Sequence, residues 1–582
     1  MRRSWFPLVG VLLAFSLVAT ACGSDNSDDP SPTPEGSGIP DTFPPLTTPT
    51  MGGTLKMAME ENLDCWSGLS YYSASFSLFF FMARGLYGYP ETIESPATDE
   101  VYPDLAAELP TVSEDGLTYS VTLREGLTFP DGQPVTAKDV KATFEYMLDP
   151  NIQCSSGGPP SSGYYEVIKG YDEFTAALTD DPASKVSLAG VTATSELTTE
   201  FRLEKPDGSF LRLLAMAWSF IRPANTPREL LDVPPSYVGP YKIENYTADK
   251  SLTVVREPTW SANVAAGVPE GDTENNIDGA ELTIGVPPEI QLAQIKANEL
   301  DLSFDSAVPS GSDVPAVAND PAYKGRFFST PDAAVSYGVF RTDKAPFDNI
   351  KLREAVNWGI DRKLAVKISG GELVKSEWSE ILSKNLMVGP FAETGEVFAL
   401  DVKKAKALVE ESGLPTPIKV SLVHGTADPG PEQAAAIKEN LDAIGFDVAL
   451  IPLSADVYYG YIADPASPYE MAFSSWGQDF ADAITFYRPL LTCPDGEPVG
   501  GNYGRFCSEK FDARVEEIAL MPVGSERTAA FSDLSTSTMQ DDAPWFPLSN
   551  RRVISFVSDR VGNYIYGPNK GFYFGTYFIK DS

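Results

Sequence analysis

Alternating apolar and polar positions predict several strands along this chain. Between positions 118 and 124, Tyr119, Val121 and Leu123 alternate with polar residues, which is the period of a strand with one buried face. Glu125-Gly126 and Pro130-Asp131-Gly132 then supply turn residues on either side of a short apolar run. This stretch is therefore predicted to be a hairpin.

A helix is predicted directly after this hairpin. Thr136 and Asp139 have the spacing of a capping box, and Val140 and Phe144 share one helical face. Asp149-Pro150 ends the helix, because proline disfavours the helical conformation in the residue before it.

Strands and helices also alternate in the C-terminal half. Residues 418–423 and 446–451 have strand patterns, and residues 432–444 between them have a helical pattern followed by Gly445. Residues 401–412 form another predicted helix, which ends before Gly413. Strands joined by helices predict an α/β architecture whose sheet includes parallel pairs.

The length and charge of the chain narrow the class of protein. More than five hundred residues follow the N-terminal leader, which predicts at least two lobes. The formal net charge is −37, which argues against nucleic acid as a partner and is explained by a solvated acidic surface. The apolar run from Leu78 to Met82 is too short to cross a bilayer and is predicted to be a buried helix.

The N-terminus has the pattern of an export signal. Two arginines precede an apolar run over residues 8–18, and Ala19-Thr20-Ala21 then leads to Cys22. The ending resembles a lipobox, so residues 1–21 are predicted to be a signal peptide and Cys22 to be lipidated; ordinary cleavage is the alternative. Residues 22–50 are rich in Ser, Asp, Pro, Gly and Thr and are predicted to be a disordered tether.

Catalytic and metal chemistry find little support in the sequence. The chain has one histidine, His424, whereas a zinc hydrolase normally uses two or three histidines or a cluster of thiolates. No Gly-x-Ser-x-Gly elbow stands between a strand and a helix. His424 follows an apolar run and is predicted to lie at the end of a strand. We therefore expect no catalytic residue, no metal and no cofactor.

Four cysteines remain after Cys22: Cys65, Cys154, Cys493 and Cys507. An even number in an exported chain predicts two disulfides, for which three connectivities are possible. A metal site is the alternative, although neither pair has Cys-x-x-Cys spacing.

Three motifs together resemble those of a known family. They are the stretch from Pro103 to Phe144, the segment Val238-Gly239-Pro240-Tyr241, and the stretch from Pro346 to Arg362. They are similar to family 5 extracellular solute-binding proteins, which are the peptide-, nickel- and oligosaccharide-binding components of ABC importers. Asn298 stands where glycine is usual, and Arg341 stands where asparagine is common.

The resemblance implies an α/β, two-lobed, periplasmic-binding-protein-like fold of type II, cluster C, with a hinge and an extra subdomain in the first lobe. The first lobe would take residues 51–330 and 546–582, with an outer subdomain at about 88–235, and the second lobe would take residues 331–545. The resemblance also implies the disulfide Cys493–Cys507, which leaves Cys65–Cys154 as the other pair.

The segment from Met471 to Asp482 resembles the Trp-x-x-Asp segment of peptide-binding members, although Ala483 stands where proline is usual. This implies that Asp479 pairs with the α-ammonium of a ligand and that Trp476 is a wall of the site. The further residues implied are Asn502 and Tyr503, which would bond ligand backbone groups, and Ser70, Tyr71 and Tyr72, which would line the cleft from the first lobe. The sequence names no positively charged partner for a ligand carboxylate, and Arg341 is a suggestion without a motif behind it.

The resemblance implies the substrate-binding component of an ABC importer and not an enzyme. It would be a monomer, lipid-anchored at the outer face of the cytoplasmic membrane or in the periplasm, that captures short peptides by lobe closure and delivers them to permease and ATPase subunits. Two alternatives stay open. One is a carrier of an oligosaccharide, opine or metal chelate, with Trp476, Phe480 and Tyr487 as possible sugar platforms. The other is a secreted hydrolase with a pair of catalytic carboxylates.

Overall fold

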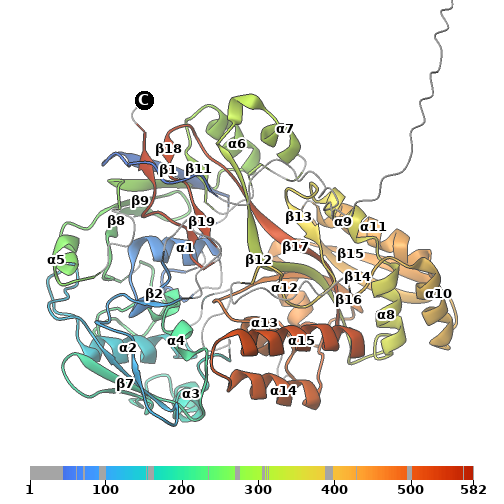
Figure 1. The fold of residues 1–582 in the computed structure, drawn as a ribbon, viewed down its shortest axis with the longest axis horizontal. Coiled ribbons are helices and arrows are strands. Elements are labelled where there is room, and N and C mark those ends of the chain that lie inside the picture. Colours follow the sequence, from blue (N-terminus) through green and yellow to red (C-terminus); the bar gives the residue numbers. More distant parts are fainter. Residues whose placement is uncertain are drawn as a thin grey trace, which may run out of the picture. The chain divides into compact units, whose positions relative to one another are not determined.

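The computed structural model describes residues 43–580, except for 61, 64, 70–72, 91–99, 153, 155–162, 234, 269–274, 305–307, 310, 312, 387–396, 428, 494–500 and 568. The predicted signal peptide, Cys22 and most of the predicted tether lie outside the described residues. The described chain has an α/β fold with two lobes, each built on its own main β-sheet (Figure 1).

The first lobe contains a five-stranded sheet with the order β11-β1-β10-β9-β8. Strand β1 is parallel to β10 and β11, whereas β9 is antiparallel to β10 and β8. The apolar run Leu78–Met82 lies in the buried helix α1, as predicted, and packs in the core of this lobe. The elements are β1 (Thr54–Met59), α1 (Ser73–Met82), β8 (Tyr241–Thr247), β9 (Ser251–Arg256), α5 (Trp260–Ala265), β10 (Gly279–Ile284), α6 (Pro288–Lys296), β11 (Leu302–Ser303) and α7 (Val314–Ala318).

A second sheet of the same lobe has four strands in the order β4-β5-β7-β6. Helix α2 packs against it, with Val140 and Phe144 fully buried, and the predicted capping box between Thr136 and Asp139 is present. The elements are β2 (Tyr87–Gly88), β3 (Tyr102–Pro103), β4 (Thr111–Val112), β5 (Thr118–Thr122), α2 (Ala137–Met147), α3 (Tyr171–Asp180), β6 (Val191–Ala193), β7 (Thr198–Arg202), α4 (Phe210–Leu213) and the 3-10 turn Ala217–Ser219.

The prediction of a hairpin at the start of this region was wrong. Strand β5 pairs with β4 and with β7 on its two edges. The apolar run after β5 contributes only an isolated bridge between Thr128 and Pro134. Both edges of β5 are occupied by these two strands, so the following segment has no edge of β5 left to pair with.

The second lobe contains a six-stranded sheet with the order β13-β17-β12-β16-β14-β15. Strand β14 is parallel to β15 and β16, which confirms the predicted parallel pairs and the predicted strand-helix-strand unit β14-α11-β15. Helices α8, α10 and α11 pack with these strands in one core (Figure 1). The elements are β12 (Phe327–Phe340), α8 (Ile350–Gly359), α9 (Arg362–Ile368), β13 (Lys375–Glu377), α10 (Val402–Glu411), β14 (Ile418–Gly425), α11 (Gly430–Asp442), β15 (Phe446–Leu453), β16 (Met471–Gly477) and β17 (Trp545–Phe556).

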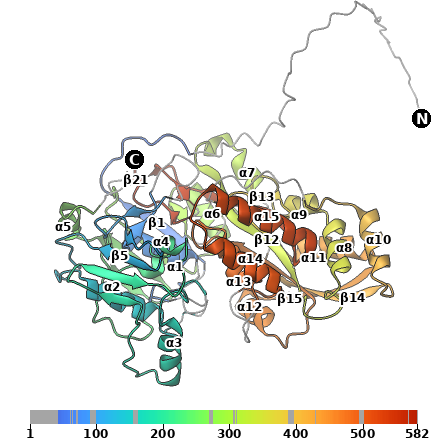
Figure 2. The same ribbon diagram turned by 60° about the horizontal axis from the view of Figure 1, so that its bottom comes forward.

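Helices α13, α14 and α15 lie side by side in the second lobe (Figure 2). Tyr487 of α13 contributes to this packing through ring contacts with Phe511 of α14 and Phe531 of α15, at 5.7 and 5.3 Å between centroids. The remaining elements are the 3-10 turn Pro321–Tyr323, α12 (Ala455–Ala463), α13 (Ile484–Leu491), α14 (Glu509–Ala519), α15 (Ser525–Asp541), β18 (Val561–Gly562), β19 (Tyr566–Gly567), β20 (Gly571–Phe572) and β21 (Phe578–Ile579).

Strands β12 and β17 are long enough to take part in the cores of both lobes. At one end, Phe327 and Phe556 pack with residues of β1 and α6. At the other end, Phe340 and Phe546 pack with the strands and helices of the second lobe. Between these ends the register shifts, so that three residues of β12 stand opposite Arg551 alone. Such a bulge bends a strand pair, and it lies where the chain passes between the lobes. The domain boundaries themselves stay predictions.

Both predicted disulfides are present. The Cα atoms of Cys65 and Cys154 are 5.7 Å apart, and those of Cys493 and Cys507 are 4.3 Å apart. The first pair ties the start of the first lobe to the segment after α2. The second closes the loop that precedes α14. These thiols are therefore not available as metal ligands.

Candidate ligand-binding site

The segment predicted to contact the ligand is a short loop between β16 and α13. At its start, the Gln478 N–H donates to the carbonyl of Ala333 on β12 at 3.0 Å, next to the bulge. At its end, Asp482 Oδ1 accepts a hydrogen bond from the Ile484 N–H at 3.0 Å. Asp479 lies between these two anchors, so the sheet and α13 together fix its position.

Asp482 is a buried structural carboxylate. Arg527 Nη2 of α15 lies 3.0 Å from Asp482 Oδ2, and both side chains are at most 3 % exposed. Arg212 of α4 lies 4.0 Å from the same oxygen. The charge of Asp482 is thus compensated within the protein, and its role is to hold the loop that carries Asp479.

Unlike Asp482, Asp479 has no basic side chain beside it in the described part of the chain. Within the part of the chain that the structure describes, its one hydrogen bond is donated by the hydroxyl of Tyr164 to Oδ2, at 2.5 Å. No arginine, lysine or histidine in the described ranges forms an ion pair with it. Burial raises the pKa of Asp479 to about 7, although the bond from Tyr164 acts in the opposite direction. A partly buried carboxyl group with a raised pKa is stabilised in its charged form by any cation that comes close to it.

Tyr164 belongs to the first lobe, so the two lobes meet at Asp479. The ring of Tyr164 also packs edge-to-face against Phe480, with centroids 5.2 Å apart. A second contact between the lobes is the ion pair of Asp207 and Arg488, at 2.9 Å. The site is therefore in a closed arrangement, in which first-lobe residues cover the Asp479 loop.

The raised pKa of Asp479 predicts how the stability of the ligand-free protein depends on pH. The folded protein holds this proton up to about pH 7, whereas the unfolded chain releases it near pH 4. The contribution of Asp479 to the unfolding free energy therefore falls as pH rises from about 4 to about 7 and is constant above. We expect the Tm of Asp479→Asn minus the Tm of the wild type to increase over this window in thermal unfolding. A difference that is flat with pH would contradict the assignment.

Trp476 is half-buried on β16, and its indole Nε1 donates to the carbonyl of Thr485 at 3.0 Å. The ring is therefore fixed against the first turn of α13, three residues from Asp479. Its predicted role as a wall of the site stays a prediction, and this position is compatible with it.

Asn502 and Tyr503 lie in the loop closed by Cys493–Cys507. The amide of Asn502 donates to the carbonyls of Thr492 and Phe506 and accepts from the Phe506 N–H, and the residue is 5 % exposed. Asn502 thus organises the loop itself. Tyr503 is half-buried, and its ring lies 5.8 Å from the ring of Tyr459. Ser70, Tyr71 and Tyr72 lie outside the described residues.

Arg341 does not suit a ligand carboxylate. The residue is 4 % exposed, and its guanidinium donates to the Asp343 carboxylate and to the carbonyls of Ser467 and Pro465. Its charge and its hydrogen bonds are used inside the second lobe, and this position does not favour Arg341 as the partner of a ligand carboxylate.

Arg551 of β17 is a partly accessible basic residue that the sequence interpretation did not consider. Its side chain is 47 % exposed and forms an ion pair with Asp332 at 2.8 Å. It lies at the bulge between the lobes, opposite Lys375 of β13. The sequence offered a sign of this residue, because Arg551 and Arg552 are two consecutive charged residues in a strand whose other residues are apolar or uncharged polar.

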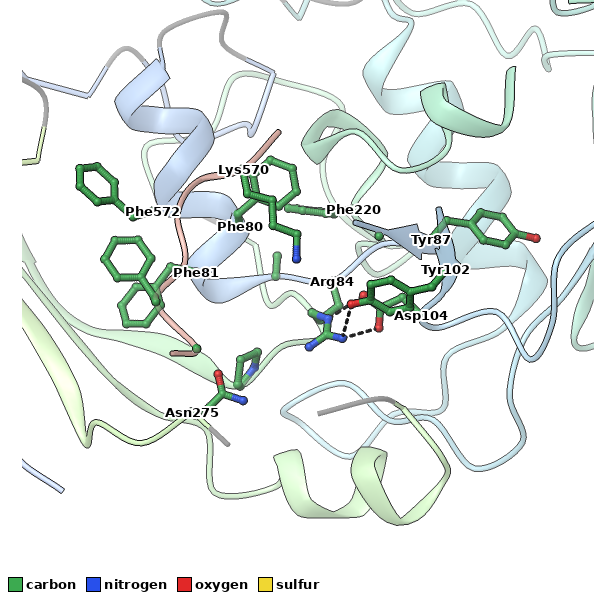
Figure 3. A pocket seen from close by; sticks show the side chains of 15 residues that line it. Phe80, Phe81, Arg84, Tyr87, Tyr102, Asp104, Phe220, Asn275, Lys570 and Phe572 are labelled. Carbon is green, nitrogen blue, oxygen red and sulfur yellow. Dashed lines mark hydrogen bonds and ion pairs between the residues drawn. The ribbon is translucent and has the colours of Figure 1, made fainter. Parts of the chain in front are cut away.

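A separate pocket lies within the first lobe (Figure 3). It is lined by the end of α1, by β2 and β3, and by the C-terminal segment around Lys570. Arg84 donates to both carboxylate oxygens of Asp104, at 2.6 and 2.8 Å, so these two charges neutralise each other. None of its lining residues comes from the second lobe, and the pocket is distinct from the Asp479 site.

His424 is 4 % exposed near the end of β14, as predicted, and its Nδ1 lies 2.8 Å from the carbonyl oxygen of Gly425. Among the described residues, no group of three or more His, Cys, Asp or Glu side chains is arranged to hold a metal ion. Within the same residues, no helix has the length and apolar character needed to cross a membrane.

Two lobes joined by long strands, with an uncompensated carboxyl group covered where they meet, define a protein that encloses a solute. The chain belongs to the bacterial extracellular solute-binding proteins, family 5, whose sequence profile matches residues 100–498. Proteins of this family bind solutes for ABC transport systems and are not enzymes.

Several known proteins are similar to this chain over most of their length. Heme-binding protein A of Haemophilus influenzae is 26 % identical over 486 residues, which cover 78 % of this chain and 80 % of that protein. The dipeptide-binding protein of Escherichia coli is 23 % identical over 491 residues, covering 81 % of this chain and 85 % of that protein. A solved structure, the clavulanic acid biosynthesis oligopeptide binding protein 2, superposes with a TM-score of 0.82 at 22 % identity, covering 94 % of this chain and 99 % of that chain, and shares its fold.

Proposed function

We propose that this protein captures short peptides with a free N-terminus by lobe closure and delivers them to a membrane permease. The observation that carries the proposal is Asp479. Its carboxyl group is withdrawn from water, accepts one hydrogen bond and has no cationic partner among the described residues. A peptide α-ammonium supplies the missing positive charge and further hydrogen-bond donors.

The position of Asp479 between the lobes supports the same function. Closure brings Tyr164 of the first lobe onto a carboxylate of the second lobe. A ligand ammonium at Asp479 therefore contacts a group that residues of both lobes approach only when the lobes are closed. Because a ligand shifts a conformational equilibrium only through contacts that differ between the states, this arrangement couples binding to closure.

The second candidate function is the binding of a solute other than a peptide, because relatives are named for different ligands. Besides the dipeptide-binding protein, relatives are named for heme, glutathione and deoxycholate. Heme and deoxycholate carry no ammonium group, so a carrier of such solutes would leave Asp479 without a cation. The electrostatics of Asp479 therefore favour a ligand with a free ammonium group, such as a short peptide or glutathione, over heme or deoxycholate.

Delivery and anchoring are part of the proposal. We infer that Cys22 is lipidated and that residues after it tether the binding protein to the outer face of a membrane, where an ABC permease receives the solute. Support comes from the signal-like N-terminus of the sequence and from the family membership. Mass spectrometry of the mature N-terminus tests this, since a diacylated Cys22 is expected and an unmodified or absent Cys22 would contradict it.

The proposed ligand class is tested by chemical modification of the ligand rather than of the protein. Calorimetric titration of ligand-free protein with di- to pentapeptides is expected to show binding, and acetylation of the α-amino group is expected to weaken it by at least a hundredfold. The reason is that the acetylated peptide brings no cation to Asp479. Equal binding of free and acetylated peptides, or binding of heme or deoxycholate alone, would overturn the proposal.

A further inference from the structure

A short loop that precedes α4 in the first lobe contacts the helices of the second lobe. Asp207 Oδ2 of this loop lies 2.9 Å from Arg488 Nη1 of α13. The next residue, Gly208, donates its N–H to the carbonyl of Ala519 at the end of α14, at 3.2 Å. The two lobes are thus joined by an ion pair and a backbone hydrogen bond that the protein makes entirely by itself.

The ion pair is buried, and both of its partners are oriented by their own lobe. The side chain of Asp207 is 1 % exposed and that of Arg488 is 11 % exposed. Asp207 Oδ1 accepts from the N–H and the hydroxyl of Ser209 at 2.8 and 2.5 Å, and Arg488 Nε donates to Glu516 Oε1 at 3.3 Å. A buried ion pair stabilises a structure only when its geometry is good and its other polar atoms are bonded, and this pair meets both conditions.

The charges of this contact balance within the protein. Glu516 pairs with Arg488 and also with Lys205 of the first lobe, so that two positive and two negative charges meet when Asp207 is included. Burial acts against the charge of Asp207, but Arg488 and the hydrogen bonds to the carboxylate outweigh it and lower the pKa of Asp207. The carboxylate therefore stays charged over the range in which Asp479 titrates, and the contact needs no ion from solution.

Gly208 lies where the backbones of the two lobes approach most closely in this contact. A Cβ atom at this position would lie 2.5 Å from the carbonyl oxygen of Met521 and 2.6 Å from Arg527 Nη1. Arg527 Nη1 is itself held by the carbonyls of Ala519 and Met521, at 2.8 and 2.9 Å, so it cannot move aside without losing these bonds. The φ angle of Gly208 is outside the left-handed region, so the loop itself accepts an alanine. Only the approach of the second lobe requires glycine here.

We propose that Asp207, Gly208 and Arg488 form a latch that favours the closed state through contacts in which the ligand takes no part. The ligand-free protein then populates the closed state, and the latch strengthens the binding of every solute by the same factor. The reason is that an apparent Kd depends on the fraction of protein in the state that binds. The three residues are positioning residues that set this fraction. The inference rests on the proposed function only in requiring that the lobes close, and it does not depend on which solute is bound.

Small-angle X-ray scattering of the ligand-free protein tests the latch directly. Gly208→Ala obstructs only the closed state, so it is expected to give a larger radius of gyration than the wild type. The matched control is Gly425→Ala, because a Cβ atom at Gly425 meets no atom within 4 Å. Asp207→Asn keeps an oxygen for the bonds from Ser209 but loses the charge, and it is expected to increase the radius as well. A lower Tm with wild-type radii in both variants would show a purely structural role and overturn the latch, and a wild-type radius in Asp207→Asn alone would overturn the part assigned to the ion pair.

Calorimetric titration with tri-alanine and with N-acetyl-tri-alanine then separates the latch from the ligand site. Gly208→Ala is expected to weaken the binding of both peptides by the same factor, about tenfold, whereas Gly425→Ala should bind as the wild type does. A loss confined to the free-amine peptide would place Gly208 in the ligand site and overturn the latch. If no peptide binds while the ligand-free radii differ as expected, the peptide assignment fails and the latch stands. If tri-alanine binds and compacts the wild type while the ligand-free radii agree, the latch alone fails.

Discussion

Asp479→Asn is expected to weaken the binding of a free-amine peptide by about 3–5 kcal/mol, which is a factor of a few hundred to a few thousand in Kd. Asparagine keeps the shape of the side chain and an oxygen that accepts from Tyr164. What it removes is the negative charge, so that a peptide ammonium enters a desolvated site without an ionic partner. Calorimetric titration of ligand-free protein measures the loss.

A double-mutant cycle separates this loss from an indirect effect. N-acetylation of the peptide removes the other partner of the same interaction, so it should weaken binding to the wild type strongly and binding to Asp479→Asn little further. Asp442→Asn is the matched control, because it removes a carboxylate from an exposed helical pair with Lys438. Additive losses from the two changes would show that Asp479 and the ammonium do not interact.

Arg527→Met is expected to lower the free energy of unfolding by about 3–5 kcal/mol. Arg527 and Asp482 are both nearly inaccessible to water and lie 3.0 Å apart. Removal of the arginine leaves Asp482 with Arg212 at 4.0 Å as its remaining basic neighbour. A buried carboxylate that has lost its nearer arginine is costly, and urea unfolding followed by circular dichroism measures that cost.

The control for this change is Arg514→Met, whose arginine is 41 % exposed and pairs with Glu517 on the same helix. It should alter stability by no more than about 0.5 kcal/mol. Because Asp482 holds the loop that carries Asp479, Arg527→Met should also weaken peptide binding. Equal stability of the two variants would contradict the structural role assigned to Asp482.

Local elements of the fold were readable from the sequence because their causes are local. The capping box of Thr136 and Asp139 and the strand-helix-strand unit over residues 418–451 depend on spacings within a few turns of chain. Both disulfides also followed, one from the family resemblance and the other as the remaining pair. These signals do not require knowledge of which distant segments meet.

Pairings between distant segments could not be read in the same way. Strand β5 pairs with β7, about eighty residues later, and nothing in its alternating pattern distinguishes that partner from the nearer apolar run. The same holds for contacts near the candidate site. Asp479 was proposed from a contiguous motif, whereas Arg551 and Asp332 are far apart in sequence and form an ion pair only through the bulged strands.

The hydrogen bond from Tyr164 to Asp479 has a consequence for the empty protein. In the ligand-free protein, a proton on Asp479 neutralises a charge that closure would otherwise leave without a cationic partner. Because the pKa of Asp479 is about 7, this protonation takes place near neutral pH. Closure of the ligand-free protein therefore becomes more favourable as the pH falls. At lower pH, the ligand-bound and ligand-free forms then differ less in how strongly they favour the closed state.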